Sequence, residues 1–280
     1  MSRGSAVART TQYATRNTHQ AYCVLRVPLF DMSILTFLVV FILTILLQRW
    51  LHHHIQGFVL ALTGNPGCGL RLLFYLLLPG IVLHEASHFV VAKFLLVHTD
   101  GIDIGIGRPQ KKRVSLGSVN IERTDPLRQS LIGIAPFIVG IGAIWLIAGA
   151  GFDLWPNAGL SFEQMIGRVR EYAYDWTTWL DLYLIFAVST AMIPSESDRE
   201  PWAPVITFFG LGVAILFLMG WKPRVPPDLV LLARQLLDAL TFALGVAVLV
   251  NGVVALALWV LERTVESISG KRVEYRVRRR

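Results

Sequence analysis

The chain of 280 residues lacks most features that mark soluble enzymes and secreted domains. Charged residues make up only 16% of it, and its two cysteines, Cys23 and Cys68, are too few for a disulfide framework. The sequence has no visible internal repeat, no glycine-rich phosphate loop, no zinc-finger spacing and no recognisable Ser/His/Asp constellation. These absences argue against the common nucleotide-binding, zinc-finger and serine-hydrolase classes.

Apolar sequence, in contrast, is abundant. Hydrophobic residues make up 54% of the chain and the mean hydropathy is +0.55, as in integral membrane proteins. Six stretches are long enough to cross a bilayer as helices: about 34 to 50, 70 to 97, 129 to 150, 177 to 193, 202 to 221 and 231 to 262. The predicted fold is an all-α polytopic membrane protein with about six transmembrane helices, which leaves little sequence for a soluble domain.

Lysine and arginine predict the orientation, because segments rich in these residues stay on the cytoplasmic side. With both termini inside, the inner segments carry 18 of these residues and the outer segments carry 4. This bias predicts basic cytoplasmic tails at residues 1–33 and 263–280, with residues 51–69 outside, in a bacterial-type cytoplasmic membrane. The net charge of +7 then reflects topology and affinity for anionic lipid headgroups, and not a nucleic-acid partner.

The first thirty residues allow more than one interpretation. They are rich in Ser, Thr and Arg and have no acidic residue before Asp31, as in organellar transit peptides. A short basic cytoplasmic tail accounts for the same composition. A third alternative is that the natural start is Met32, so that "MSILTFLVVFILTILL" is the true N-terminus.

Three titratable side chains interrupt the apolar run "PGIVLHEASHFVVAKFLL", residues 79 to 96. His84 and His88 are four residues apart, so a helix places both on one face, where they can bind one metal ion. Glu85, rotated by about 100° from His84, can instead meet a water on that metal. In this HExxH pattern, Zn²⁺ lowers the pKa of its water toward about 7 and the glutamate is the general base. Simple polar packing is disfavoured, because each ionisable group in hydrocarbon costs roughly 2.5 to 3.5 kcal/mol.

A catalytic zinc takes a third protein ligand. The predicted topology puts the histidines in the inner half of their helix, so this ligand must come from another inner helix end. The predicted fourth helix ends there at "STAMIPSESDRE", where Pro194 breaks the helix and Asp198 is the candidate ligand. Glu196 is the rival ligand. Alternatively, Asp198 only caps the fifth helix, together with Ser195 or Ser197.

Residues 98–128 predict a short β-hairpin at the membrane surface, because apolar and polar residues alternate on both sides of a basic turn. The alternating apolar residues are Ile102, Ile104, Ile106, Val114, Leu116, Val119 and Ile121. The edge of this hairpin would suit an extended peptide, and a basic interfacial hairpin without a peptide partner fits equally. In the next helix, Gly133, Pro136, Gly140 and Gly142 suit either close helix packing or a flexible gate.

Together these motifs resemble the site-2 protease family of intramembrane zinc metalloproteases. "HEASH" matches the family's HExxH motif, and Asp198 lies two helices later, as the aspartate of the family's "LDG" motif does. "GIDIGIGRP" and "VSLGSVNIERTDPLRQSLIGIAPFIVGIGAIWLI" resemble the family's surface β-loop and the glycine- and proline-bearing helix after it. The resemblance departs at "IPSESDRE", which lacks the leucine before and the glycine after the aspartate, and at Thr190, which replaces the family's asparagine.

The resemblance covers about residues 70 to 200 and implies the domain organisation. Residues 70–200 would form the metalloprotease core, with three transmembrane helices and the hairpin. The first transmembrane helix and outer loop at 34–69 and two C-terminal transmembrane helices at 201–262 would flank this core.

The resemblance also implies a function, namely zinc-dependent hydrolysis of a peptide bond in or near a transmembrane segment of a membrane-protein substrate. Zn²⁺ would be held by His84, His88 and Asp198, with Glu85 as general base. The alternative is a non-catalytic membrane metal-binding protein, either a metal-ion transporter or an inactive protease-like scaffold. The sequence gives no indication of an oligomeric state.

Overall fold

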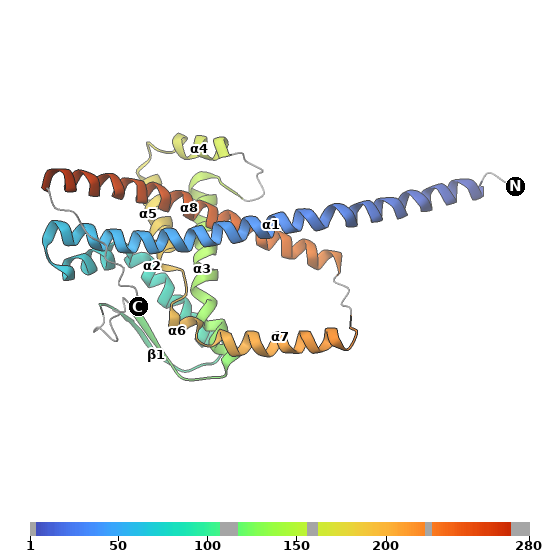
Figure 1. Ribbon diagram of the computed structural model, residues 1–280, viewed down its shortest axis with the longest axis horizontal. Helices are drawn as coiled ribbons and strands as arrows, with labels where there is room; N and C mark the ends of the chain where they lie inside the picture. The colour runs from blue at the N-terminus through green and yellow to red at the C-terminus, as the bar shows by residue number, and fades with distance from the viewer. Residues whose placement is uncertain (1–3, 107–116, 156–161, 222–225, 270–280) are drawn as a thin grey trace.

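The computed structural model describes residues 4–106, 117–155, 162–221 and 226–269 and is mostly helical (Figure 1). The helices in these residues are α1 (Gly4–Thr63), α2 (Pro66–Phe94), α3 (Pro126–Phe152), α4 (Phe162–Glu171), α5 (Trp176–Ala191), α6 (Glu196–Arg199), α7 (Trp202–Leu218) and α8 (Pro227–Ser269). Two strands, β1 (Thr99–Ile104) and β2 (Gly117–Ile121), form a small antiparallel sheet.

The described residues contain five helical segments long and apolar enough to cross a membrane, where the sequence predicted about six. They are Met32–Thr63, Gly67–Phe94, Pro126–Phe152, Glu196–Leu218 and Pro227–Ile268. The predicted span at 177–193 is α5, which has only 16 residues. It begins after Asp175, whose side chain accepts the N–H of Thr177, and it ends at Ala191, shortly before Pro194. The described helices are therefore consistent with an integral membrane protein, with a different helix count.

Helix α1 is longer than predicted, and residues 51–63, expected as part of an outer loop, are helical. Helix continues through the polar residues that follow Trp50 and through Gly57, because no proline interrupts it before the turn at Gly64, which has φ +67°. The next helix begins immediately, with Asn65 as N-cap accepting the N–H of Gly67. The turn between α1 and α2 is therefore only two residues long.

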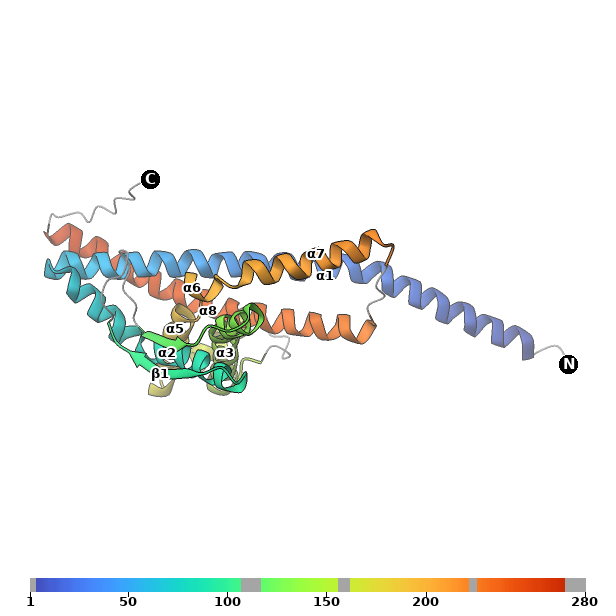
Figure 2. The same cartoon turned by 90° about the horizontal axis from the view of Figure 1, so that it is seen from below.

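Helices α1 and α8 lie side by side and run in the same direction, as Figures 1 and 2 show. Phe41, early in the apolar part of α1, packs on the cluster that contains Leu244 of α8. Later in both helices, Nδ1 of His54 lies 2.8 Å from Oε2 of Glu262. The ends of α1 and α8 therefore lie at the same end of the molecule, whereas an even number of crossings would make the first and last helices antiparallel.

The other long helices cross this pair. In Figure 1, α3 and α5 run across α1 and α8, and Figure 2 views α3 nearly end-on. The main apolar cluster lies where they meet and includes Ile144 of α3, Ile185 of α5 and Leu244 of α8, all fully buried. Helix α2 packs against α1, α3 and α5, which brings the HExxH segment next to the C-terminal end of α5.

The predicted hairpin is confirmed over its described part. Strands β1 and β2 pair with Ile102 opposite Val119 and Ile104 opposite Gly117. Its base docks on the helices, where Ile121 packs against a cluster of Val97, Ala92 and Ile132. The basic turn, with Val114 and Leu116, lies outside the described residues.

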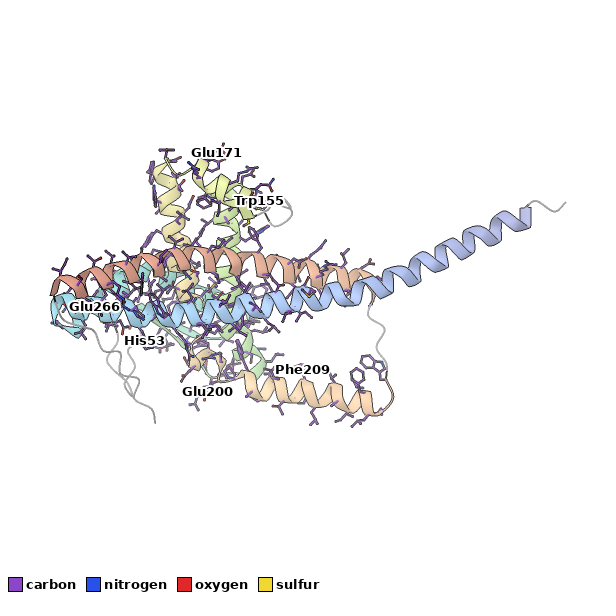
Figure 3. All side chains as sticks on the ribbon, turned by 45° about the horizontal axis from the view of Figure 1, so that its top comes forward. His53, Trp155, Glu171, Glu200, Phe209 and Glu266 are labelled. Atoms are coloured by element: carbon purple, nitrogen blue, oxygen red, sulfur yellow. The ribbon has the colours of Figure 1, made fainter. Side chains whose placement is uncertain are left out.

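Helix α7 extends away from the helical core (Figures 1 and 3). No residue of α7, which the structure describes over its whole length, is buried, and Phe209 at its middle is more than half exposed. Helix α6 and the residues around it connect α7 to α5. The position of this connection, and not of α7 itself, determines the geometry of the site below.

Candidate metal centre

The two histidines of the HExxH segment face the same side of α2, as their four-residue spacing predicts. Their Nε2 atoms are 3.2 Å apart. His88 is buried and His84 is nearly so, with 13% of its side chain exposed. The helix therefore presents two imidazole nitrogens to one small volume in the interior of the molecule.

Each histidine is oriented by a backbone carbonyl of a neighbouring helix. Nδ1 of His84 lies 2.8 Å from the carbonyl oxygen of Ala191, the last residue of α5. Nδ1 of His88 lies 2.9 Å from the carbonyl oxygen of Ile132 in α3. A carbonyl oxygen can only accept, so Nδ1 must be the donor in both rings, and in the neutral imidazole Nε2 then carries a lone pair.

Asp198 completes the cluster from α6. Its Oδ1 lies 3.4 Å from Nε2 of His88, and its Oδ2 lies 3.7 Å from Nε2 of His84. The alternative role considered for this residue is also realised, because Asp198 forms a capping box with Ser195. In that box Oδ2 accepts the N–H of Ser195 at 2.7 Å, and the Ser195 hydroxyl oxygen accepts the N–H of Asp198 at 3.3 Å. The cap thus fixes the carboxylate in the position where it faces both histidines.

The three side chains are close enough to one another to hold a single metal ion. Zinc binds imidazole nitrogen and carboxylate oxygen at about 2.0 to 2.2 Å, so tetrahedral ligand atoms are about 3.3 to 3.5 Å apart. The two Nε2 atoms are 3.2 Å apart, Oδ1 of Asp198 is 3.4 Å from His88 and Oδ2 is 3.7 Å from His84. With one ligand atom taken from each residue, all three atoms lie within 4.8 Å of one another. Among the described residues this is the one group of three or more His, Cys, Asp or Glu side chains with ligand atoms close enough for a single ion.

The electrostatics of the cluster also favour a cation at its centre. With Nδ1 donating to carbonyls, two nitrogen lone pairs and a carboxylate converge in a largely buried volume. Such acceptors repel one another unless a metal ion or a shared proton lies between them. The donor set of two imidazoles and one carboxylate is one that catalytic zinc uses.

Glu85 lies beside this cluster and under the hairpin. It is buried, with 8% of its surface exposed. Its side chain contacts the first residue of β2 so closely that a Cβ at Gly117 would lie 2.8 Å from Oε1. A larger residue at 117 would displace either the strand or the carboxylate, so the base of the hairpin helps to define the position of Glu85.

Glycines in α2 and α3 make room for the segment that carries Asp198. A Cβ at Gly133 would overlap the carbonyl oxygen of Asp198 and lie 3.0 Å from its carbonyl carbon. A Cβ at Gly140 would lie 2.6 Å from Cβ of Met192, and one at Gly80 would lie 2.9 Å from Cβ of Ala191. The packing interpretation is confirmed for Gly133 and Gly140, whereas Gly142 has nothing within 4 Å of such a Cβ.

The sequence interpretation missed a buried polar junction behind the site. The amide of Gln48 in α1 donates to the main-chain oxygen of Ser189, and the amide of Asn251 in α8 donates to the Ser189 hydroxyl at 3.0 Å. All three residues are buried. The signal that could have found them is an isolated amide in each apolar run, because uncompensated polar groups are costly in hydrocarbon.

Two further residues considered from the sequence lie close by in the chain. Thr190 is 3% exposed, and its hydroxyl has no hydrogen-bond partner among the described residues. Glu196, the rival ligand, is the exposed first residue of α6 and is not part of the metal-ligand group. The geometry therefore favours Asp198 over Glu196.

Comparison of the chain with protein-family models, with curated proteins and with solved structures gave no match. The functional argument for this protein therefore depends on its own residues and their geometry.

Proposed function

We propose that this protein is an intramembrane zinc metalloprotease that cleaves a peptide bond in or near a transmembrane segment of another membrane protein. The observation that carries the proposal is the convergence of Nε2 of His84, Nε2 of His88 and the carboxylate of Asp198 beside Glu85. Two histidines and one carboxylate would hold the ion and leave a fourth position for water or substrate. When bound there, Zn²⁺ would supply a Lewis acid that polarises a peptide carbonyl and acidifies water.

Glu85 has the role of general base and acid in this proposal. Glu85 directly follows His84 but points to a different side of α2, so its carboxylate is not one of the three proposed metal ligands. Its oxygen would take the proton from the attacking water and later deliver it to the leaving amine. Burial beneath the hairpin keeps bulk water away from this carboxylate.

The hairpin supports a peptide as the substrate. Gly117 of β2 lies against Glu85, so a chain pairing with the sheet near this residue would run past the general base. Extended peptides add to exposed strand edges through main-chain hydrogen bonds, which is how many proteases hold their substrates. The apolar residues Ile102 and Ile104 of β1 are about two-fifths exposed and could contact a membrane-embedded substrate.

Metal analysis tests the first half of the proposal. The protein purified in detergent should contain about one zinc per chain. The double variant His84→Ala/His88→Ala should contain none, because only one carboxylate of the ligand set remains. Equal zinc content in parent and variant would place the metal elsewhere and overturn the proposed site.

A Glu85→Gln variant tests the second half and separates an enzyme from a metal-binding protein. Glutamine keeps the size of the side chain but cannot accept the proton, so zinc should be retained while cleavage of a transmembrane reporter falls by about 10² or more. Full cleavage by Glu85→Gln would contradict the catalytic role. Zinc binding with no cleavage by either parent or variant, over a range of reporters, would favour a transporter or an inactive scaffold.

A further inference from the structure

The carbonyl that orients His88 has an unusual origin. Ile132 lies inside α3, where the normal donor to its oxygen would be the N–H of residue 136, one turn later. Residue 136 is proline, which has no N–H and whose ring pushes the carbonyl of the preceding turn aside. The oxygen of Ile132 instead accepts from Nδ1 of His88 at 2.9 Å.

The other histidine uses a carbonyl freed in a comparable way. Ala191 is the last residue of α5, and the last four carbonyls of a helix have no partner within it. Its oxygen accepts from Nδ1 of His84 at 2.8 Å. In hydrocarbon each unpaired carbonyl is costly, so the helix break at one histidine and the proline at the other each create an acceptor that a histidine must satisfy.

The position of Pro136 makes this effect specific to the site. Pro136 is fully buried, and the turn between it and Ile132 also contains Gly133, which packs against the backbone of Asp198. One turn of α3 therefore contacts a histidine ligand through a carbonyl and the carboxylate ligand through a close backbone approach. A helix with a normal hydrogen-bond ladder would have no free carbonyl to offer at this point.

We infer that Pro136 is a positioning residue of the metal centre, which keeps the Ile132 carbonyl available to hold His88 with Nε2 directed at the metal. The inference rests on the proposed zinc site and deepens it. Hydrogen-bond partners of metal-binding histidines fix the tautomer and the ring orientation, and their loss typically lowers metal affinity about 10- to 100-fold. An N–H restored at position 136 would compete with His88 for the Ile132 oxygen.

Two substitutions that differ in their effect on helix stability provide the test. Pro136→Ala and Pro136→Gly both restore the N–H, but alanine is the best and glycine nearly the poorest helix former. Zinc affinity of the full chain, measured by chelator competition, should fall about tenfold or more in both variants. The absorption of bound Co²⁺ should change in both as well, whereas thermal unfolding should separate them. Gly142→Ala, on the same helix with open space around it, is the matched control and should bind zinc as the parent does.

The outcomes distinguish this inference from the proposed function. Parental zinc affinity and cobalt spectra in both Pro136 variants would overturn the positioning role while leaving the zinc site intact. A loss of affinity that follows thermal stability, present in Pro136→Gly alone, would also overturn it. If the parent binds no zinc, the proposed function fails, and ¹⁵N spectra of histidine in the metal-free protein still test the inference. The Nδ1–H form of His88 should then be fixed in the parent and lost in Pro136→Ala.

Discussion

The position of Asp198 suits both of the roles that the sequence presented as alternatives. Its carboxylate caps α6 through Ser195 and faces His84 and His88 at the same time. The cap consists of hydrogen bonds that an amide can also accept, whereas a metal ligand benefits from the negative charge. The two roles can therefore be separated by changing the charge alone.

Asp198→Asn should lower zinc affinity by about tenfold or more, since a neutral amide oxygen is a weaker zinc ligand than a carboxylate. The metal-free protein should lose at most about 1 kcal/mol of stability, because the side-chain oxygen of asparagine can still accept the N–H of Ser195 in the capping box. Glu196→Gln, two residues earlier on the same short helix, is the control and should keep its zinc. Zinc retained in Asp198→Asn and lost in Glu196→Gln would make Glu196 the third ligand.

Helix packing places α6 within reach of α2. The main chain at Asp198 can approach α3 only because position 133 has no side chain, and Met192 sits over Gly140 in the same way. Small residues at helix contacts in membranes allow such close approach of backbones. The ligand geometry therefore depends on a helix that contributes no ligand.

Gly133→Ala should push α6 away from α3 and shift Asp198 relative to the two histidines, because its Cβ would overlap the carbonyl oxygen of Asp198. Overpacking of this kind costs about 1 to 3 kcal/mol, and we expect a zinc affinity at least tenfold below that of the parent. The comparison is Gly142→Ala, which makes the same chemical change where no atom lies within 4 Å. Equal zinc affinity in the two variants would show that the close approach at Gly133 is unimportant for the site.

The buried amides attach α1 and α8 to α5. Asn251→Leu should remove the hydrogen bonds to Ser189 and destabilise the protein by about 0.6 kcal/mol, the mean for polar contacts between membrane helices, and by at most about 1.7 kcal/mol. Unfolding in SDS-containing mixed micelles measures this change. Thr44→Val is the control, since the Thr44 hydroxyl bonds to Val40 of its own helix, and it should cost less. An Asn251→Leu variant as stable as the parent would contradict a role for the junction.

The whole chain presents a conflict between charge and packing. The lysine and arginine bias predicts residues 51–69 outside and 263–280 inside. Parallel packing of α1 and α8, with His54 against Glu262, instead brings the ends of both helices to one side of a membrane that both cross. An odd number of crossings satisfies the packing, and five helical segments have the necessary length.

Single cysteines decide between these topologies. In a background without Cys23 and Cys68, Thr63→Cys and Ile268→Cys should react with a membrane-impermeant reagent from the same side. Asp103→Cys in β1 should react from the opposite side, because α2 crosses between Thr63 and the hairpin. Reaction of positions 63 and 268 from opposite sides would support the charge-based topology and contradict the α1–α8 packing.

Local sequence determined the parts of this protein that depend on spacing along one helix or one strand. The HExxH spacing places His84 and His88 on one face of α2 whatever surrounds them, and alternation from Ile102 onward gives a hairpin. The break before Pro194 was also readable, and with it the candidate ligand Asp198. These features need only the periods of the helix and the strand and the chemistry of proline.

Tertiary structure alone decided what those elements meet. Hydropathy predicted that the first span ends at residue 50, whereas α1 continues to Thr63. One reason is that the polar side chain of His54 finds a partner in Glu262, 208 residues later in the chain. The orientation of His88 by Ile132, the junction at Ser189 and the approach of Asp198 to Gly133 all join residues far apart in the chain. No periodicity encodes such pairs, because burial makes each polar group need a partner but the packing of the helices selects which one it finds.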